Sequence, residues 1–349
     1  MSERTVRLGL IGCGFYAQNH LHAWMDLKAE GVELVAVCDT EPEKAGRAAE
    51  AFSAKAYTNA KSMFENERID LVDITTQMNS HKALAALAAN YGAGAIVQKP
   101  FAPSFEEAIE IVENAKKHGT WLAVHENFRF GTGMRRVKAV INSGAIGQAT
   151  WGRFSFRTGY DVFKNQPYLA QEKRLVILDV GIHVLDLARY FFGEVDHVSC
   201  ETQTRLPMIK GEDTATILMK HQSGAVSIVE STYSARKIPD AFPETLEDIE
   251  GSEGAISVTR GETMQVTTQG IFFEEKIGSP LLSWTSRPWH GSQEAVLHTN
   301  RHMLHTFRNG KSADTSGDDN LKTYALVEAA YESARTHASV RPKKWSPTT

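Results

Sequence analysis

Lys99, Asp179 and His183 are the side chains of this sequence best suited to moving protons and stabilising charge. Histidine changes its charge near neutral pH, so His183 suits a general base that removes a proton from a hydroxyl group. Asp179 lies four positions earlier, a spacing that puts both side chains on one face of a helix beginning at Asp179 and ending near Phe192. Lys99 can stabilise negative charge that develops on a substrate oxygen. Together these residue types indicate the dehydrogenation of an alcohol, in which a base takes the proton while a hydride leaves the carbon.

Each of the three residues also has a purely structural interpretation. Lys99 comes before Pro100 and is therefore kept out of helical geometry, but at the end of a strand it could equally be a solvated surface residue. Asp179 could serve only as the N-cap of its helix, and His183 could be a buried histidine with satisfied hydrogen bonds. The catalytic interpretation requires that the chain also carry a site for the acceptor of the hydride.

A glycine-rich motif is the candidate for that site. It comes directly after the first expected strand and reads Gly12, Cys13, Gly14, Phe15, Tyr16 and Ala17. This matches G-x-G-x-x-G/A, in which the first glycine permits a tight turn, the second lets the backbone approach a pyrophosphate, and the small third residue allows close helix–strand packing. Backbone amides at the helix N-terminus attract the phosphates. The loop therefore predicts a dinucleotide bound at Gly12, Gly14, Phe15 and Tyr16.

The choice between NAD and NADP depends on Asp39, which follows the second expected strand. Its carboxylate can accept hydrogen bonds from both ribose hydroxyls, whereas its charge would repel a 2′-phosphate. The next residue is Thr40 rather than an arginine that could bind such a phosphate. NAD is therefore the expected cofactor. The same loop could instead be a plain glycine turn followed by a capping aspartate, or could belong to a methyltransferase fold.

The first 125 residues alternate between short apolar runs and helical patterns. The apolar runs are continuous, as expected for parallel strands that are covered on both faces. The expected strands are residues 6–11, 32–38, 71–74, 95–98 and 121–124, and the expected helices are residues 16–28, 41–52, 81–90 and 104–117. Right-handed crossovers then predict an α/β fold with a doubly wound parallel sheet, which binds ligands beyond the carboxyl ends of its strands.

A second domain, of α+β type, is expected over residues 126–341, after a cofactor domain at 1–125 and before a tail at 342–349. Several of its segments alternate between apolar and polar residues, which is the pattern of a mostly antiparallel sheet with one buried face. These segments are residues 149–157, 198–203, 213–220, 225–233 and 255–259. Helical patterns at 293–309 and 318–337 could cover this sheet or return to the first domain.

The 349 residues include 38 Lys and Arg against 42 Asp and Glu, a formal net charge of −4. Without a basic surplus, neither nucleic acid nor an anionic membrane is an expected partner. Three cysteines without CxxC spacing, and no visible signal peptide or membrane span, predict a cytoplasmic protein. No metal is expected, because hydride transfer needs none, although His298, His302 and His305 share one helix face.

These motifs together resemble the Gfo/Idh/MocA family of nicotinamide-dependent oxidoreductases over residues 6–254. Further matches lie at 127–130 and 143–147. The resemblance implies an N-terminal Rossmann domain that binds NAD, with Lys99, Asp179 and His183 as the catalytic set. It also implies contacts to the nicotinamide half of NAD from Thr75, Thr76, His81, Gln98 and Lys99.

The chain departs from the family pattern at two places. The family usually has Glu-Lys-Pro where this chain has Gln98 before Lys99, which removes an acid beside that lysine. The family also has a glycine-rich run where this chain has residues 172–175, so the approach to the substrate pocket is expected to differ.

The resemblance implies NAD-dependent oxidation of a sugar or polyol hydroxyl, and we expect this oxidation at the anomeric carbon of an aldose, which gives a lactone. An inositol or polyol dehydrogenase acting on a secondary alcohol is the nearest alternative, and a non-catalytic NAD-binding sensor is the alternative from another class. A hydroxyl-rich substrate requires polar partners, and the candidates are Lys99, Arg129, Arg157, Tyr160, Asp161, Asp179 and His183. A homo-oligomer formed through the C-terminal sheet is also expected.

Overall fold

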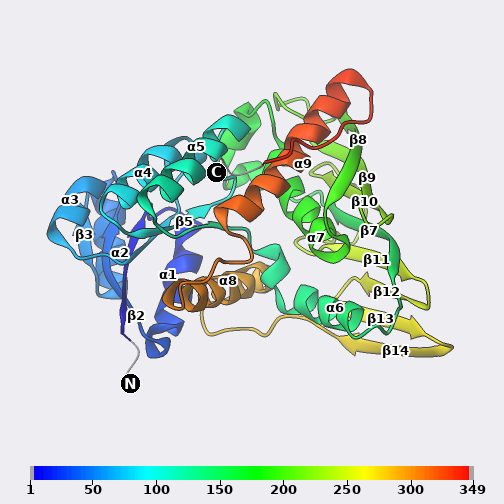
Figure 1. Cartoon of the computed structure of the whole chain (residues 1–349), viewed down its shortest axis with the longest axis horizontal. Helices are drawn as coiled ribbons and strands as arrows, with labels where there is room; N and C mark the ends of the chain where they lie inside the picture. Colours follow the sequence, from blue (N-terminus) through cyan, green and yellow to red (C-terminus); the bar gives the residue numbers. More distant parts are fainter. Residues whose placement is uncertain (1–3, 346–349) are drawn as a thin grey trace. The chain divides into compact units, whose positions relative to one another are not determined.

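The structure is a computed structural model that describes residues 4–345 (Figure 1). The chain forms two compact units. The first contains the residues up to Glu126 together with Val296–Leu321, and the second contains Asn127–Ala295 and the residues from Lys322 onward. None of the helices within residues 4–345 is long and apolar enough to span a membrane. Of the expected tail, residues 346–349 lie outside the described part of the chain.

The first unit is built on a six-stranded sheet in the order β3-β2-β1-β4-β5-β6, and every strand pairing is parallel. Its strands are β1 (Val6–Ile11), β2 (Val32–Cys38), β3 (Lys55–Tyr57), β4 (Leu71–Ile74), β5 (Gly94–Gln98) and β6 (Leu122–His125). Every residue of β4 and β5 is buried, which explains why these strands are nearly continuous apolar runs in the sequence. The strand order reverses between β1 and β4, the kind of switch point at which doubly wound sheets bind ligands.

Helices cover both faces of this sheet, with α4 and α5 on the side opposite α1 (Figure 1). They are α1 (Ala17–Asp26), α2 (Pro42–Phe52), α3 (Ala60–Asn66), α4 (His81–Asn90) and α5 (Phe105–His118). The ends of α5 show how local chemistry sets a helix boundary. The Ser104 hydroxyl accepts the N–H of Glu107 at 3.2 Å, and Gly119 ends the helix with a φ of 64°.

A late segment completes the first unit. Most of α8 (His290–Arg308) belongs to it, and the Phe307 ring packs edge-on to Trp121 with the ring centroids 5.6 Å apart. A Cβ on Gly94 would lie only 2.7 Å from the Phe307 ring, so β5 must start with glycine for this helix to pack there. The helix expected at residues 293–309 therefore packs on the first sheet.

The second unit contains an eight-stranded sheet in the order β14-β13-β12-β11-β7-β10-β9-β8. Its strands are β7 (Ala149–Arg157), β8 (Val195–Gln203), β9 (Thr214–His221), β10 (Val226–Thr232), β11 (Leu246–Gly251), β12 (Gly254–Thr259), β13 (Thr263–Thr268) and β14 (Ile271–Lys276). All strand pairings are antiparallel except that of β10 with β7. The predicted fold class, a parallel doubly wound sheet followed by a mostly antiparallel one, is confirmed.

The helix α7 (Ile182–Phe192) lies against β7 and β10, and all of its residues except Tyr190 are buried. It directly follows a single π-helical turn, Ile177–Gly181, so the helix expected from Asp179 begins with a wider turn than an α-helix has. The other long helices with residues in this unit are α6 (Thr132–Asn142) and α9 (Gly317–Thr336). Exposed and buried residues alternate along β9, which leaves Leu218 exposed.

Candidate active site

The glycine loop follows β1 and opens α1, as the sequence predicts. Gly12 has a φ of +96°, in the left-handed region, and a Cβ there would lie 2.9 Å from the backbone carbonyl carbon of Thr75. The Thr75 hydroxyl donates to the Gly12 carbonyl oxygen at 2.7 Å. Both the backbone angle and the close approach require glycine at this turn.

Beyond that turn, the loop has room for a ligand. A Cβ on Gly14 would meet no other atom within 4 Å, and Phe15 and Tyr16 are exposed. The side chain of Tyr16, the N-cap residue of α1, makes no cap hydrogen bond, and the N-terminus of a helix attracts anions. These features fit the pyrophosphate of a dinucleotide.

Asp39 follows β2, and two backbone amides hold its carboxylate. Its Oδ2 accepts the N–H of Cys13 at 2.7 Å, and its Oδ1 accepts the N–H of Glu41 at 2.9 Å. The bond from Cys13 ties the carboxylate to the glycine loop. A carboxylate has about four acceptor positions, so each oxygen can also accept a ribose hydroxyl, while the negative charge opposes a 2′-phosphate. The arrangement fits NAD better than NADP.

The segment after β4 carries Thr75, Thr76 and His81. The ring of His81 is fully buried, with Nε2 3.0 Å from the carbonyl oxygen of Thr76 and Nδ1 3.1 Å from that of Phe101. Burial lowers the pKa of His81, so a neutral imidazole donates to one of these two carbonyls. His81 therefore joins the segments that follow β4 and β5, the strand ends beside the expected nicotinamide site.

Lys99 follows β5 directly, and its peptide bond to Pro100 is cis. Its backbone N–H donates to Oε1 of the Gln98 side chain at 2.7 Å. Lys99 is partly exposed, and it lies at the carboxyl edge of the sheet, the edge that also carries Gly12 and Asp39. The first unit thus brings together all the residues that were predicted to bind the cofactor.

In the second unit, Asp179 and His183 come from the π turn and the first turn of α7. The Tyr233 hydroxyl donates to Asp179 Oδ2 at 2.6 Å. Burial and the negative charge of Asp179 raise the pKa of Tyr233 well above its usual value, so this phenol stays a donor. The His183 ring is buried and stacks on Phe128, with the centroids 4.0 Å apart and the planes 2° from parallel. Tyr233 is a contact that sequence reasoning missed, since its only signal was its place at the end of a strand.

The other predicted substrate residues also lie in the second unit. The guanidinium of Arg129 is buried and donates to both carboxylate oxygens of Asp186, through Nε at 2.6 Å and Nη2 at 2.5 Å. Arg157 is the last residue of β7. The ring of Tyr160 stacks on Phe242, with the centroids 4.2 Å apart. Asp161 accepts two backbone N–H groups of the following turn.

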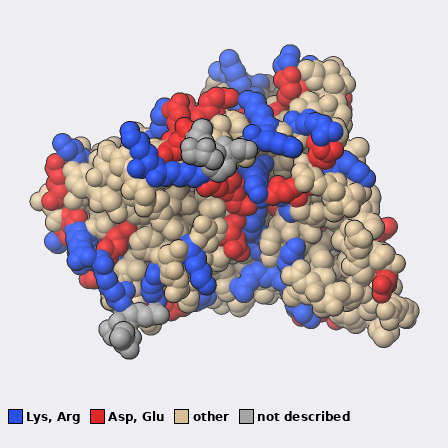
Figure 2. Space-filling model, in the orientation of Figure 1, with Lys and Arg blue, Asp and Glu red and all other residues tan. Residues whose placement is uncertain are grey.

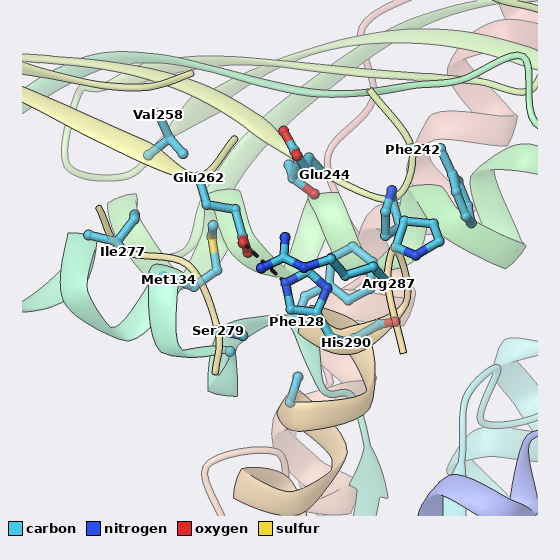
Figure 3. A pocket seen from close by; sticks show the side chains of 18 of the residues that line it. Phe128, Met134, Phe242, Glu244, Val258, Glu262, Ile277, Ser279, Arg287 and His290 are labelled. Carbon is cyan, nitrogen blue, oxygen red and sulfur yellow. Dashed lines mark ion pairs between the residues drawn. The ribbon is translucent and has the colours of Figure 1, made fainter. Parts of the chain in front are cut away.

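A pocket of about 270 Å³ lies in the same unit (Figure 3). Phe128 forms part of its wall, so one aromatic ring both contacts His183 and borders the pocket. The pocket contains an ion pair between Glu262 and His290, with 3.7 Å between Oε2 and Nε2, and burial raises the pKa of Glu262. Most of the remaining wall is apolar and comes from β12, α6, the segments before α8 and the first turns of α8, including Met134, Val258, Ile277 and Ala295.

The three histidines of α8 have separate partners in the first unit. His302 Nε2 accepts the backbone N–H of Asp314 at 2.9 Å, and His305 Nε2 lies 3.3 Å from Glu30. His298 lies 3.4 Å from Arg301. Within residues 4–345 no group of three or more His, Cys, Asp or Glu side chains is arranged to hold a metal ion.

The sequence matches two family domains. Residues 6–126 match the NAD-binding Rossmann fold of the oxidoreductase family, and residues 134–257 match the C-terminal domain of the Gfo/Idh/MocA family. The chain therefore belongs to the Gfo/Idh/MocA family, and its first unit is an NAD-binding domain. The predicted family and the predicted cofactor are confirmed.

Several relatives match nearly the whole chain. A D-apiose dehydrogenase of Rhizobium rhizogenes is 46% identical over 97% of this chain and 98% of its own length. A D-apiose dehydrogenase of Paraburkholderia graminis is 42% identical over 96% of this chain and 89% of its own length. The crystal structure of an oxidoreductase from Agrobacterium radiobacter in complex with NAD+, L-tartaric acid and magnesium superposes with a TM-score of 0.94, with 46% identity and coverage of 96% and 98% of the two chains.

Proposed function

We propose that this chain oxidises D-apiose at its anomeric carbon and gives a lactone. Sequence identity of 46% and 42% to two D-apiose dehydrogenases, extending over nearly the whole chain, carries the proposal. The broader activity is that of an NAD-dependent sugar dehydrogenase. The particular sugar and the lactone product are the proposed part.

Oxidation of a cyclic hemiacetal removes one hydrogen from the anomeric carbon and one from its hydroxyl group. Bound NAD supplies the acceptor for the hydride, so the protein must accept the proton. We assign that proton to the imidazole of His183, which must be neutral to receive it. Stacking on Phe128 fixes the plane of this ring before a substrate binds, and such preorganisation reduces the entropic cost of reaching a reactive geometry.

Asp179 and Lys99 have supporting roles in this proposal. The Tyr233 hydroxyl orients the Asp179 carboxylate, which then anchors a substrate hydroxyl or stabilises the protonated form of His183. The ammonium group of Lys99 stabilises the substrate oxygen as it changes from hydroxyl to carbonyl, because that oxygen carries negative charge during the change.

Arg157, Tyr160 and Asp161 are proposed to bind the other hydroxyl groups of the sugar. They follow one another closely at and after the end of β7, in the unit that also holds His183. Arg129 would have to bind the substrate while keeping its two hydrogen bonds to Asp186. Stacked rings such as Tyr160 on Phe242 also offer a surface for the apolar face of a sugar.

A substrate screen tests the proposal. The purified chain is incubated with NAD and D-apiose, other aldoses, myo-inositol or other polyols, and NADH formation is followed by absorbance. We expect the highest kcat/KM with D-apiose and a lactone, or its hydrolysed acid, as the product. His183→Asn serves as the control for activity from a contaminating dehydrogenase.

Two outcomes would overturn the proposal. A higher kcat/KM with myo-inositol would favour the secondary-alcohol dehydrogenase; relatives that are 24% and 26% identical are named as inositol 2-dehydrogenases. Tight binding of NAD without turnover of any sugar or polyol would favour the sensor.

We also propose a homo-oligomer that buries the edge of the second sheet. β14 exposes Ile271 by 62%, Phe272 by 59% and Phe273 by 37%. Figure 2 shows mostly uncharged side chains at the lower right, where this strand lies, although the last three residues of the strand are Glu274, Glu275 and Lys276. Phe272→Lys should lower the mass measured by sedimentation, whereas a wild-type chain that sediments as a monomer would rule out the oligomer.

A cytoplasmic location is proposed from the cysteines. Cys13, Cys38 and Cys200 are free and buried, and none forms a disulfide within residues 4–345. Fractionation of cells that express the tagged chain tests this location, and recovery from an oxidising compartment would contradict it.

A further inference from the structure

A network of buried hydrogen bonds in the first unit ends at the backbone N–H of Lys99. We propose that Asp73, His20 and Gln98 are positioning residues that fix the Lys99–Pro100 turn and thereby aim the Lys99 ammonium group. This inference rests on the proposed catalytic role of Lys99. It adds Asp73 and His20 to the predicted site, and it gives the buried Gln98 side chain a role that differs from its expected contact with the nicotinamide.

Three secondary-structure elements contribute residues to this network. His20 comes from α1, Asp73 from β4 and Gln98 from the last position of β5. His20 Nδ1 lies 2.8 Å from Asp73 Oδ2, and His20 Nε2 lies 3.0 Å from Gln98 Nε2. Gln98 Oε1 then accepts the Lys99 N–H at 2.7 Å. His20 and Asp73 are 0% exposed and Gln98 is 7% exposed, so water does not compete for these bonds.

The Lys99 backbone amide determines which atom donates and which accepts in every hydrogen bond of this network. An N–H can only donate, so the end of the Gln98 side chain that faces it is the carbonyl oxygen. The NH₂ end of Gln98 therefore donates to Nε2 of His20. That nitrogen must be unprotonated, which leaves Nδ1–H as the donor to Asp73. Asp73 Oδ2 also accepts the indole N–H of Trp24 at 2.7 Å.

The groups around His20 support this assignment. Burial alone would raise the pKa of Asp73, but the hydrogen bonds from His20 and Trp24 oppose this effect, so the pKa is lowered and the carboxylate stays ionised. The His125 ring packs on His20 with 4.2 Å between centroids, and burial lowers the pKa of His125 to about 3. The Tyr16 ring lies on another side at 5.6 Å. The cluster thus holds one negative charge and a neutral His125.

The amide of Gln98 has a consequence that a carboxylate would not have. A glutamate, the residue that the family usually has at this position, could accept the Lys99 N–H with one oxygen. Its other oxygen would face Nε2 of His20, and that contact is favourable only if the two groups share an added proton. The amide of Gln98 allows the same geometry without an added proton. The turn at Lys99 and Pro100 in this protein therefore forms without protonation of either side chain.

A merely structural role would also explain buried bonds between α1, β4 and β5, and the experiment must separate the two. Gln98→Met keeps the volume but removes both bonds, and Gln98→Glu keeps the shape but adds a titratable group. Thr315→Val is the matched control, because it removes a buried hydrogen bond, from Thr315 to the Val124 carbonyl at 2.8 Å, elsewhere in the same unit. Binding of NAD and the melting temperature report whether each variant is folded.

We expect Gln98→Met to lower kcat about tenfold with little change in the dissociation constant of NAD, since a small displacement of a catalytic group slows chemistry more than binding. Gln98→Glu should add a pH-dependent step to the kcat profile. Thr315→Val should leave both unchanged. In a Lys99→Met background, Gln98→Met should cost nothing further, because a residue that acts through Lys99 has no effect once the lysine is gone.

The outcomes distinguish this inference from the proposed function. If Lys99→Met keeps near-normal turnover, the proposed role of Lys99 fails. If Lys99→Met is impaired but both Gln98 variants keep the wild-type kcat and pH profile, the positioning role is overturned. Equal losses from Gln98→Met with and without Lys99 would also overturn it in favour of a structural role. Should Gln98→Met not fold, the pH profile of Gln98→Glu decides.

Discussion

A buried acidic side chain is ionised in the first unit and largely protonated in the second. In the first unit, the carboxylate of Asp73 is bonded to His20 and Trp24 and stays ionised. In the second, neither carboxyl oxygen of Glu247 on β11 has a hydrogen-bond partner among residues 4–345, and burial raises its pKa to about 8. An acid is kept charged where its bonds lead toward the candidate site, and it is kept largely protonated where it only fills the sheet.

The units also differ in how they place the predicted catalytic groups. Lys99 is placed by its backbone, at the end of a buried strand and through one amide hydrogen bond. Asp179 and His183 are placed by side chains that come from other elements, Tyr233 and Phe128. Substitutions in the first unit should therefore alter the position of the Lys99 charge, whereas substitutions in the second should alter proton transfer to His183.

The largest effect is expected in the second unit. His183→Asn keeps the approximate size and hydrogen bonding but removes the base, and should lower the rate by about 10²–10⁴. NAD binding should be nearly unchanged, and the fall in activity at acidic pH, which arises when the imidazole takes up a proton, should disappear. Steady-state kinetics across pH measure both effects. A variant that kept the rate and its acidic limb would move the base elsewhere, with Lys99 as the first candidate.

The matching change in the first unit should be somewhat weaker. Lys99→Met removes the charge that stabilises the substrate oxygen and should lower kcat by about 10²–10³. Its pH profile should keep the acidic limb, because His183 is intact. If Lys99→Met lost the acidic limb of the pH profile, the assignment of proton transfer to His183 alone would be wrong.

A smaller effect is expected at the cofactor. Asp39→Ala should narrow the preference of kcat/KM for NAD over NADP by about tenfold, because the 2′-phosphate would no longer meet a carboxylate. Glu43→Ala removes an exposed acid from the nearby α2 and is the control for a general change of charge. Equal preference in the wild-type chain would contradict the ribose-binding role of Asp39.

The last effect concerns stability rather than activity. The pKa of Glu247 is raised in the folded chain to about 8 from an unfolded value near 4.5, so its protonated form stabilises the fold fully below about pH 4.5. That contribution is lost as pH rises toward 8. Glu247→Gln, which cannot ionise, should therefore gain stability relative to the wild type by roughly 3–4 kcal/mol as pH rises from 5 to 8. Urea unfolding at the two pH values measures the difference, and a constant difference would show that Glu247 does not titrate in this range.

The strands of the first unit could be predicted from the sequence because burial on both faces leaves unbroken apolar runs. β1, β2 and β4 have the bounds that were expected. β3 was missed, since it has three residues of which two are exposed. β11 was also missed, because Glu247 occupies a buried position and Leu246 lies on the outward face, which hides the alternation, and β14 is exposed along nearly its whole length.

The candidate site could likewise be predicted only where its residues lie in a local sequence motif. The glycine loop and Asp39 could be found because the motif lies within one strand, one turn and one helix. The bond from Tyr233 to Asp179 joins residues 54 positions apart, and the bonds from Arg129 to Asp186 join residues 57 apart. No local pattern reports such contacts, and the π turn before α7 likewise has no signature in the sequence.

The discontinuous first unit has a consequence for the chain as it is synthesised. Residues up to Glu126 leave the ribosome early, but Val296–Leu321 belongs to the same unit. That late segment supplies Asn300, whose side-chain oxygen lies 3.0 Å from buried His125, and the ring that packs on Gly94. At about 5–20 residues per second, it emerges roughly 10–40 s after the first part. The surface around Gly94 and His125 in the nascent cofactor domain therefore stays uncovered until nearly all of the second unit has been translated.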